Sequence, residues 1–349
     1  YYFLKNNNII WMSERDGWHH IYIHAQDGSI VKQLTKGEWE VKNIVDVDEK
    51  NKKVYFISNK ETVFENRLYS VNFDGSGLKL LTKEPGMHTI RMFPNQDGFI
   101  DSYSSIDTPT RHLLKDANGK NISVIKETNK SQFEAYDWSY PKIIQFKSTD
   151  GAISLDGIVT YPPNLKKGKR YPVIVHGYGM PGTQIVYNRW GSVWNQYLAQ
   201  QGYIVFSMDA RGMSGRGEDF KNLSYGDMSK YLSKDTAAGV RHLIDSGVAD
   251  PDRIGAWGWS GGGYFTGLML TKNADLFDVG VSVAPVMDFR LYDSIYTERS
   301  MGLPQDNKAG YDSTSVLTYA DRFKGKLLVM HGTGDDNVHS QNMTWLIEE

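Results

Sequence analysis

The chain has 349 residues, 39 lysines and arginines against 41 aspartates and glutamates, and a formal net charge of -2. This length is sufficient for two ordinary domains, and the near-neutral charge gives no electrostatic support for a nucleic acid or membrane partner. The absence of cysteine excludes disulfides, cysteine-bound metals and a thiol nucleophile, but it leaves the cellular compartment open. No apolar run reaches the roughly 18 residues that span a bilayer, and no signal-peptide pattern begins the chain.

A repeat occupies the first 138 residues. Three alternating segments each end in Asp-Gly or Asn-Gly, at Gly28, Gly75 and Gly119, and such pairs are typical of hairpin turns. The glycines are 47 residues (28 to 75) and 44 residues (75 to 119) apart, a period typical of β-propeller blades. Further strands are expected at residues 9–12, 54–57 and 99–103. Because propellers typically have four to eight blades, we interpret residues 1–138 as the last blades of an incomplete propeller.

Three histidines in the first repeat, His19, His20 and His24, invite comparison with a metal site. His19 and His20 point to opposite faces of a strand, while His20 and His24 stand about 13 Å apart along one face. That separation is too large for a single ion. We therefore predict no metal here, and no cofactor is implied elsewhere.

From Ser139 onward, strands and helices alternate. Strands are expected at residues 142–147, 153–161, 172–175, 203–208, 254–257, 279–283 and 327–330, and helices at 189–201, 233–246, 264–270 and 341–349. Alternation of this kind predicts a mostly parallel, doubly wound sheet covered by helices. The order of the elements is that of an α/β-hydrolase domain over residues 139–349.

A possible nucleophile lies in the pentapeptide Gly258-Trp259-Ser260-Gly261-Gly262. The bare pattern arises by chance in roughly one chain in ten of this length. Here a short apolar strand precedes the serine and a helix follows it, which is the setting of a nucleophile elbow. We therefore predict that Ser260 is a catalytic nucleophile.

The acid and base of an α/β-hydrolase follow the serine in the order Asp or Glu, then His. Asp335 follows the strand at 327–330 and is the expected acid, whereas Asp336 is expected to cap a helix. After Ser260 the chain contains two histidines, His331 and His339, and neither lies on the loop expected for the base. We expect the catalytic histidine beyond residue 349, and this segment alone to be inactive.

The oxyanion of an acyl-transfer intermediate requires two donors. One is expected to be the amide of Gly261, the residue after the nucleophile. The other is expected in the loop His176-Gly177-Tyr178-Gly179, from either a backbone N–H or the hydroxyl of Tyr178.

Three stretches, 258–263, 292–304 and 331–339, together resemble the dipeptidyl peptidase IV branch of the prolyl oligopeptidase family of serine peptidases. Residues 172–181 and 209–212 also resemble it. The resemblance covers nearly all of residues 139–349, and the propeller expected before them agrees with the family's two-domain plan.

The resemblance implies a role for each matching residue. Ser260 is the nucleophile, Asp335 the triad acid, and the Tyr178 hydroxyl an oxyanion donor beside Gly261. Asn337 is implied to bind the carbonyl of the substrate residue before proline. The implied wall of the proline pocket consists of Val286, Phe289, Tyr292, Tyr296 and Val338. Tyr292 and Tyr296 are spaced to share one face of a helix.

Two residues depart from the family's pattern. Gly261 replaces a residue that is usually aromatic, and Phe289 stands where relatives often have tryptophan. Both changes predict a roomier pocket that accepts alanine as well as proline. The family's paired glutamates, which select dipeptide release, lie in earlier blades, so release of dipeptides, release of tripeptides and internal cleavage stay open.

The leading hypothesis is a serine peptidase that cleaves after proline near peptide N-termini and releases X-Pro dipeptides. Its implied partners are a peptide substrate and, by family analogy, a second copy in a homodimer. One alternative is an esterase or acylaminoacyl peptidase with the same fold. Another is a non-catalytic binding module in which the propeller is the functional part.

Overall fold

The computed structural model describes residues 1–349, apart from the side chain of Glu134. Its contacts divide the chain into two compact units. The first contains residues 1–136, with two short later segments, 187–191 and 215–219. The second contains residues 137–186, 192–214 and 220–349.

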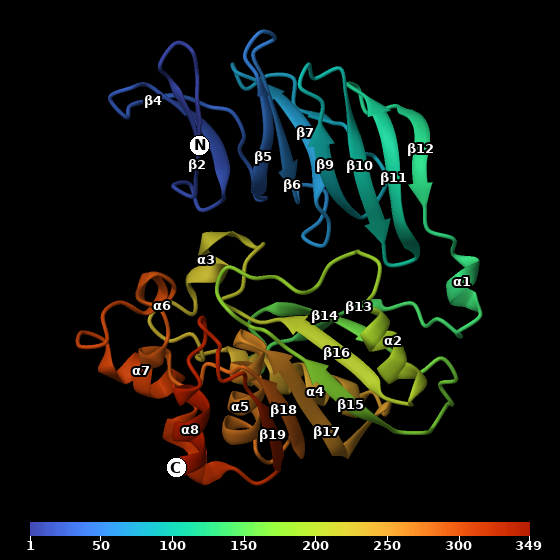
Figure 1. Cartoon of the computed structure of the whole chain (residues 1–349), viewed down its shortest axis with the longest axis vertical. Helices are drawn as coiled ribbons and strands as arrows, with labels where there is room; N and C mark the ends of the chain where they lie inside the picture. Colours follow the sequence, from blue (N-terminus) through green and yellow to red (C-terminus); the bar gives the residue numbers. More distant parts are fainter. The chain divides into compact units, whose positions relative to one another are not determined.

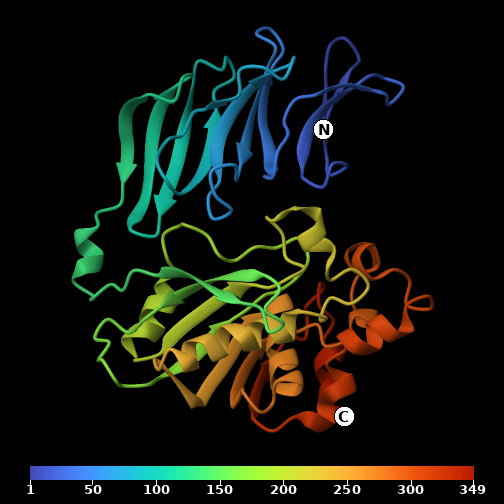
Figure 2. The same ribbon diagram turned by 180° about the vertical axis from the view of Figure 1, so that it is seen from behind.

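Within the described residues, the first unit contains three four-stranded antiparallel sheets, which stand side by side in Figures 1 and 2. The strands of the three sheets are β1 (Tyr2–Phe3), β2 (Ile9–Ser13), β3 (His20–His24) and β4 (Ile30–Gln33); β5 (Val41–Asp48), β6 (Lys53–Ser58), β7 (Arg67–Asn72) and β8 (Lys79–Leu80); β9 (Met87–Met92), β10 (Gly98–Ser105), β11 (Thr108–Asp116) and β12 (Asn121–Glu127). A short helix, α1 (Ser131–Glu134), follows them.

The three turn glycines occupy equivalent places between the third and fourth strands of their sheets. Gly28, Gly75 and Gly119 have φ values of 84°, 81° and 84°, a region that glycine enters without steric cost. The predicted hairpins are therefore present, and each repeat is one four-stranded blade.

The third sheet buries the ionisable side chains of Lys115, Asp101 and His88, which meet the partly exposed Glu84. Lys115 of β11 is 0% exposed, and its Nζ lies 2.7 Å from Glu84 Oε2 and 3.2 Å from Asp101 Oδ2. His88 completes the cluster, with Nδ1 2.9 Å from Asp101 Oδ1 and Nε2 2.8 Å from the carbonyl oxygen of Glu84. Because an isolated buried charge is unfavourable, each of these groups depends on its partners.

The second unit is built on a seven-stranded sheet of order β13-β14-β16-β15-β17-β18-β19. Its strands are β13 (Lys142–Lys147), β14 (Ser154–Thr160), β15 (Tyr171–His176), β16 (Ile204–Asp209), β17 (Ala249–Trp259), β18 (Val279–Val283) and β19 (Lys326–Met330). The pairs β13–β14 and β14–β16 are antiparallel, and the other pairs are parallel. This is the predicted α/β-hydrolase sheet.

Helices cover the two faces of this sheet unequally (Figures 1 and 2). Helices α4 (Leu232–Asp245) and α5 (Gly261–Lys272) pack on one face and α2 (Val193–Gln200) on the other. The remaining helical segments are α3 (Gly217–Asn222), η1 (Phe289–Leu291), α6 (Ser294–Met301), α7 (Lys308–Thr314), η2 (Leu317–Arg322) and α8 (Gln341–Glu348).

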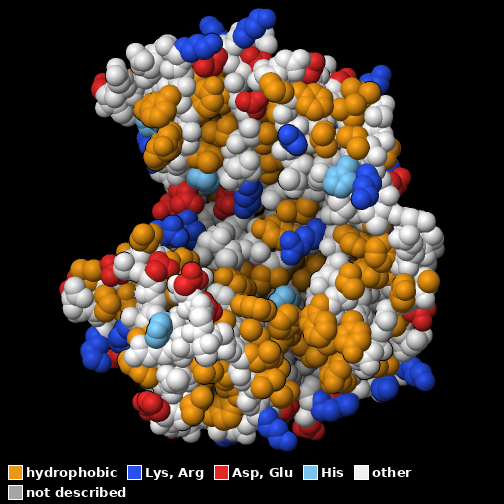
Figure 3. All heavy atoms as spheres, viewed as in Figure 1, with side chains coloured by type: hydrophobic (Ala, Val, Ile, Leu, Met, Phe, Trp, Pro, Cys, Tyr) orange, Lys and Arg blue, Asp and Glu red, His pale blue; other side chains and the backbone are white. Residues whose placement is uncertain are grey.

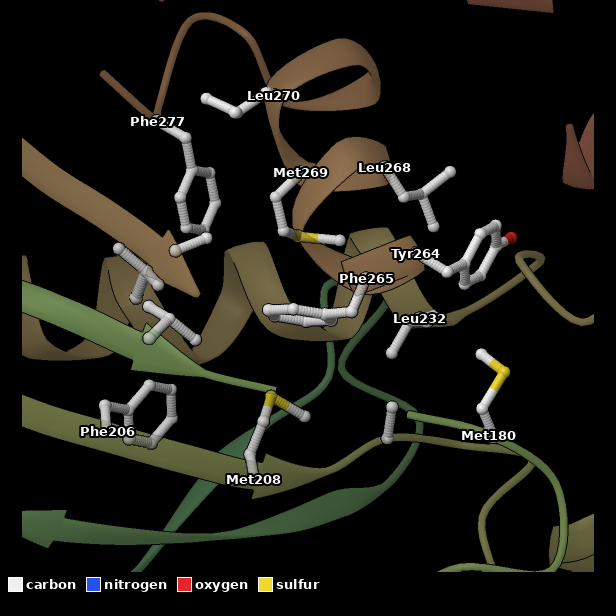
Figure 4. Packing of buried hydrophobic residues seen from close by; sticks show 14 of the residues in the cluster. Met180, Phe206, Met208, Leu232, Tyr264, Phe265, Leu268, Met269, Leu270 and Phe277 are labelled. Carbon is white, nitrogen blue, oxygen red and sulfur yellow. The ribbon is translucent and has the colours of Figure 1, made fainter. Parts of the chain in front are cut away.

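The main core of this unit lies between the sheet and α5. Figure 4 shows Tyr264, Phe265 and Leu268 of α5 among the buried apolar side chains, with Phe206 of β16 in the same cluster. Since almost every residue of α5 is buried, the helix is apolar on all sides rather than on one stripe. The core therefore fixes the helix that directly follows Ser260.

The opposite face of the sheet carries an apolar surface. The strand register aligns Trp257 with Val281 and Leu328 in one row, and Trp259 with Val283 and Met330 in the next. Trp259 is 65% exposed, Leu328 55% and Met330 50%. Figure 3 shows apolar side chains gathered over this part of the second unit.

Element boundaries differ from prediction in several places. Strands β13 and β18 match the predicted ranges, whereas β17 begins five residues before its predicted start, at Ala249 instead of residue 254. The helix expected from residue 189 begins at Val193, because residues 187–191 make their contacts in the first unit. There Asn188 N donates to the carbonyl of Phe64 at 2.8 Å. Helices α3 and α7 were not predicted, and in the region of α6 the sequence indicated only the helical spacing of Tyr292 and Tyr296.

Replacing the buried lysine tests the charge cluster. We expect Lys115→Met to destabilise the third sheet by about 3–5 kcal/mol, because Asp101 then remains buried without its lysine partner. Hydrogen-exchange mass spectrometry of peptides from β9–β12 measures the effect as lost protection. Lys126→Met, on the exposed neighbouring strand β12, is the control and should change protection by no more than about 0.5 kcal/mol. Equal losses in the two variants would contradict the prediction.

Candidate active site

Ser260 occupies the turn between β17 and α5, with φ 57° and ψ −117°. This backbone conformation is strained for any residue with a side chain. Two hydrogen bonds hold it: the Ser260 amide donates to the Val283 carbonyl at 2.9 Å, and the Ser260 carbonyl accepts from the Tyr264 amide at 3.0 Å. The predicted sequence of strand, sharp turn and helix is present.

The surrounding glycines allow three backbone segments to touch. A β-carbon on Gly258 would lie 2.5 Å from the carbonyl carbon of Gly262. One on Gly262 would lie 2.6 Å from the carbonyl oxygen of Gly177, and one on Gly263 2.7 Å from that of Val283. Side chains at these positions would collide with backbone, so the motif's glycines are a packing requirement.

Tyr178 lies beside the residue that follows the serine. Gly261 is the first residue of α5, so its amide has no acceptor within the helix. Two ring atoms of Tyr178, Cε1 and Cζ, lie 3.1 Å from the position of a β-carbon on Gly261. The phenol is 37% exposed. The two predicted oxyanion donors are therefore neighbours at this turn.

Asp335 organises the loop after β19. Its Oδ1 accepts hydrogen bonds from the amides of Val338 at 3.0 Å and Asn337 at 3.1 Å. These bonds, the one from Val338 first, hold the pKa of Asp335 below its ordinary value despite the opposing effect of desolvation, and nearby His331 lowers it further. Asp335 is therefore a carboxylate at neutral pH.

The two histidines of this loop make contacts within it. His331 Nε2 lies 2.7 Å from the Val338 carbonyl oxygen and 3.6 Å from Asp335 Oδ2. Because a carbonyl oxygen only accepts, His331 Nε2 carries the hydrogen. His339 Nδ1 accepts from the amide of Gln341, the first residue of α8. Both rings therefore support the loop that carries Asp335.

Three of the residues predicted to form the proline pocket, Phe289, Tyr292 and Tyr296, lie in one aromatic row. Phe289 packs edge-on against Tyr264 at a centroid distance of 5.0 Å and against Tyr292 at 6.4 Å. Tyr292 in turn meets Tyr296 at 5.9 Å with an interplanar angle of 77°. Three of the predicted pocket residues are 2–3% exposed: Val286, Phe289 and Val338.

Both tyrosine hydroxyls of this row have acceptors. Tyr292 donates to Asn337 Oδ1 at 3.0 Å, and Tyr296 donates to the Pro181 carbonyl at 3.2 Å. Burial is the main cause that raises the pKa of both phenols, so both stay protonated at neutral pH. The expected shared helical face is wrong: Tyr292 caps η1, whereas Tyr296 lies in α6, which begins at Ser294. The turn between η1 and α6 brings the two tyrosine rings into contact.

Two buried polar residues that sequence reasoning missed hold the loops of the site. Asn342 of α8 is 0% exposed, and its Oδ1 accepts from the amides of Met287 at 2.9 Å and Asp288 at 3.2 Å. Asp209, at the end of β16, accepts through Oδ1 from the amides of Ile185 at 2.7 Å and Val186 at 3.3 Å, in the loop after β15. In the sequence, the one feature that could have indicated the role of Asn342 is a polar residue at a buried position of a helix.

The described residues form neither a metal site nor a membrane-spanning helix. The part of the chain that the structure describes contains no group of three His, Cys, Asp or Glu side chains placed to hold a metal ion. Within the same residues, no helix has the length and apolar character needed to cross a membrane.

Models of known protein families match both parts of the chain. The model of the prolyl oligopeptidase family matches residues 190–349, which include Ser260 and Asp335. The model of the dipeptidyl peptidase IV (DPP IV) N-terminal region matches residues 1–110. The chain belongs to the prolyl oligopeptidase family. Within that family it is similar to DPP IV, in agreement with the resemblance of the sequence motifs.

Individual family members agree with this assignment. The chain is 35% identical to dipeptidyl peptidase 4 of Trichophyton equinum over 341 residues, which is 95% of this chain and 44% of that protein. Dipeptidyl peptidase 4 of Trichophyton rubrum is 34% identical over the same shares. The crystal structure of Porphyromonas gingivalis dipeptidyl peptidase 4 matches with a TM-score of 0.94 and 32% identity, covering 99% of this chain and 49% of that one. The chain thus spans about half the length of these family members.

The strained backbone at Ser260 leads to a prediction about the free energy of unfolding. A glycine enters the φ and ψ of Ser260 readily, because they mirror the ordinary extended region. We therefore expect Ser260→Gly to be more stable than Ser260→Ala by about 1 kcal/mol, measured by urea denaturation.

Ser282 is the comparison position, since it is a serine with ordinary backbone geometry in the regular strand β18; it is fully buried, whereas Ser260 is half-buried. There the order should reverse, with Ser282→Gly less stable than Ser282→Ala by about 0.5–1 kcal/mol. The same order at both positions would show that the turn is not strained.

Proposed function

We propose that this protein is a serine peptidase that cleaves after proline, and also after alanine, near peptide N-termini. It would release X-Pro dipeptides through an acyl-enzyme on Ser260. The observation that carries the proposal is the strained turn of Ser260, with Tyr178 and Gly261 beside it and the aromatic row nearby. The names of the family members, dipeptidyl peptidases, support the release of dipeptides.

In the proposed reaction, Ser260 Oγ forms a bond to the carbonyl carbon of the scissile peptide while its proton passes to an imidazole base. The Gly261 amide and the Tyr178 hydroxyl donate to the resulting oxyanion. Collapse of the intermediate breaks the C–N bond, and the leaving amine takes the proton from the imidazolium. Water then attacks the acyl-enzyme by the same route and regenerates Ser260.

Asp335 suits the role of the acid that orients the base. Its carboxylate is held in place by the amides of Val338 and Asn337 and is ionised at neutral pH, as is needed to stabilise an imidazolium. We assign the base to neither His331 nor His339, because each is engaged in the loop of Asp335. The family resemblance assigns it to a histidine beyond residue 349.

The pocket's hydrogen bonds explain why proline fits it. A pyrrolidine ring has no N–H and buries well against aromatic faces. The hydroxyls of Tyr292 and Tyr296 are already committed to Asn337 and Pro181, so the row offers ring surface rather than free donors. With its Oδ1 occupied by Tyr292, Asn337 retains its Nδ2 hydrogens for the carbonyl of the substrate residue before proline.

The first test is activity of the full-length protein. We expect hydrolysis of Gly-Pro-p-nitroanilide, weaker hydrolysis of Gly-Ala-p-nitroanilide and covalent labelling by a fluorophosphonate probe. Ser260→Ala should abolish all three. Hydrolysis of p-nitrophenyl acetate or N-acetyl-Ala-p-nitroanilide without Gly-Pro activity would favour the esterase or acylaminoacyl peptidase. A folded protein whose Ser260 resists the probe would favour the non-catalytic module.

A second prediction concerns the bond between Tyr292 and Asn337. Tyr292→Phe keeps the ring but frees the Asn337 carboxamide to rotate, so we expect KM for Gly-Pro-p-nitroanilide to rise by about fivefold to tenfold with kcat largely kept. Asn337→Ala should have a similar effect. Because both changes remove one interaction, the double variant should be little worse than either single variant.

Tyr296→Phe is the matched control for this cycle. Its hydroxyl bonds the Pro181 backbone and not Asn337, so its effect should multiply with that of Asn337→Ala. If Tyr292→Phe also multiplied with Asn337→Ala, Tyr292 would not position the carboxamide.

A further inference from the structure

The space beside Gly261 is already filled. A β-carbon on Gly261 would lie 2.6 Å from Met180 Cγ, well inside the roughly 3.5–4.0 Å of a normal carbon–carbon contact. The same position is 3.1 Å from two ring atoms of Tyr178. Met180 comes from the loop after β15, and Gly261 from the turn after β17. A side chain after the nucleophile and the methionine of the neighbouring loop therefore exclude one another.

Met180 has little freedom to move away. It is 3% exposed and belongs to the main core, where Figure 4 shows its side chain near Leu232 and Tyr264. Its carbonyl accepts from the amide and the hydroxyl of Thr183, and the next carbonyl, that of Pro181, accepts from Tyr296. These bonds fix the backbone of the loop on both sides of the side chain.

The preceding residue allows no shift either. Gly179 has φ 74°, and a β-carbon there would lie 2.3 Å from Leu232 Cδ1. The loop is thus packed against α4 at residue 179 and against α5 at residue 180. Any atom added at Gly261 must displace the thioether rather than the backbone.

We propose that Met180 is a specificity-determining residue of the acyl pocket, filling beside Ser260 the volume that a side chain at residue 261 would otherwise fill. The inference rests on the proposed peptidase function. It revises the expectation from sequence that Gly261 makes the pocket roomier, because the volume left by the glycine is occupied from a different loop. Since Met180 and Tyr178 share that loop, the pocket wall and the oxyanion donor are held as one piece.

The wall made by Met180 differs physically from one made by a side chain at residue 261. A methionine side chain has three rotatable bonds and adapts its shape to neighbours. Truncating it leaves space next to the nucleophile, and that space favours a substrate ring larger than proline. The six-membered-ring homologue of proline, pipecolic acid, is therefore the discriminating substrate.

The test is a double-mutant cycle in the full-length protein with Gly-Pro and Gly-pipecolyl p-nitroanilides. We expect Met180→Ala to raise the ratio of kcat/KM for the pipecolyl substrate over the prolyl substrate by about tenfold. Gly261→Ala alone should lower kcat/KM for Gly-Pro by about tenfold, because its β-carbon displaces Met180. In the Met180→Ala background the same Gly261→Ala change should have almost no effect.

Met269→Ala is the control, because Met269 is a fully buried methionine of the same core that the proposed site does not use. It should lower the melting temperature without changing the substrate ratio. An unchanged ratio in Met180→Ala, or an equal change in Met269→Ala, would overturn the inference. The inference would also be overturned if the effects of Met180→Ala and Gly261→Ala on kcat/KM simply multiplied in the double variant.

The melting temperatures of the same variants separate this inference from the proposed function. If neither amide were hydrolysed by the wild-type protein, the proposed function would fail. The steric exclusion would still predict that Gly261→Ala lowers the melting temperature in the presence of Met180 and not in the Met180→Ala background. A penalty of equal size in both backgrounds would then overturn the inference.

Discussion

The second unit depends on the close approach of three backbone segments at Ser260. Strand β17 passes against the first turn of α5, and that turn lies against the carbonyl of Gly177 after β15. No side chain fits at these crossings, and the serine between them is forced into a positive φ. Such strain persists only where the surroundings over-determine it. Here the buried helix α5 does so, because residues 261–271 all lie inside the core.

Since the turn is fixed by the core, the other parts of the site have to be brought to it. The loops after β15, β18 and β19 leave the same edge of the sheet, because the carboxyl ends of parallel strands meet there. Each loop is then tied by a polar side chain, which is buried for Asp209 and Asn342 and half-buried for Asp335. Asp209 holds the loop of Tyr178, Asn342 holds residues 287–288 beside the proposed pocket, and Asp335 binds the amides of its own loop. These bonds replace flexibility with a defined geometry, which acyl transfer requires.

Much of this arrangement could be predicted from local patterns. The Asp-Gly turns and the short apolar strands are determined by neighbouring residues, so blades and sheet were predictable, and Ser260, Tyr178 and Asp335 stood out through motifs. The bounds of helix α6 could not be predicted, since it exposes Ile295 and lacks a clear apolar stripe. The roles of Asn342 and Asp209 could not be predicted for a different reason: their hydrogen-bond partners lie 55 and 24 residues away in the chain. Their role exists only after folding.

Gly261 is another residue whose role cannot be predicted from its neighbours in the sequence. From the sequence alone, a glycine in place of an aromatic residue predicts a loss of side-chain volume at that position, because the neighbouring residues in the sequence do not compensate for it. In the folded chain, the compensating atoms belong to Met180 on another loop. A substitution beside a nucleophile therefore has to be interpreted together with whatever packs over it. In the proposed site, this exchange places the pocket wall on the loop of Tyr178 instead of the strained turn, so a shift of that loop would alter substrate fit and oxyanion stabilisation together.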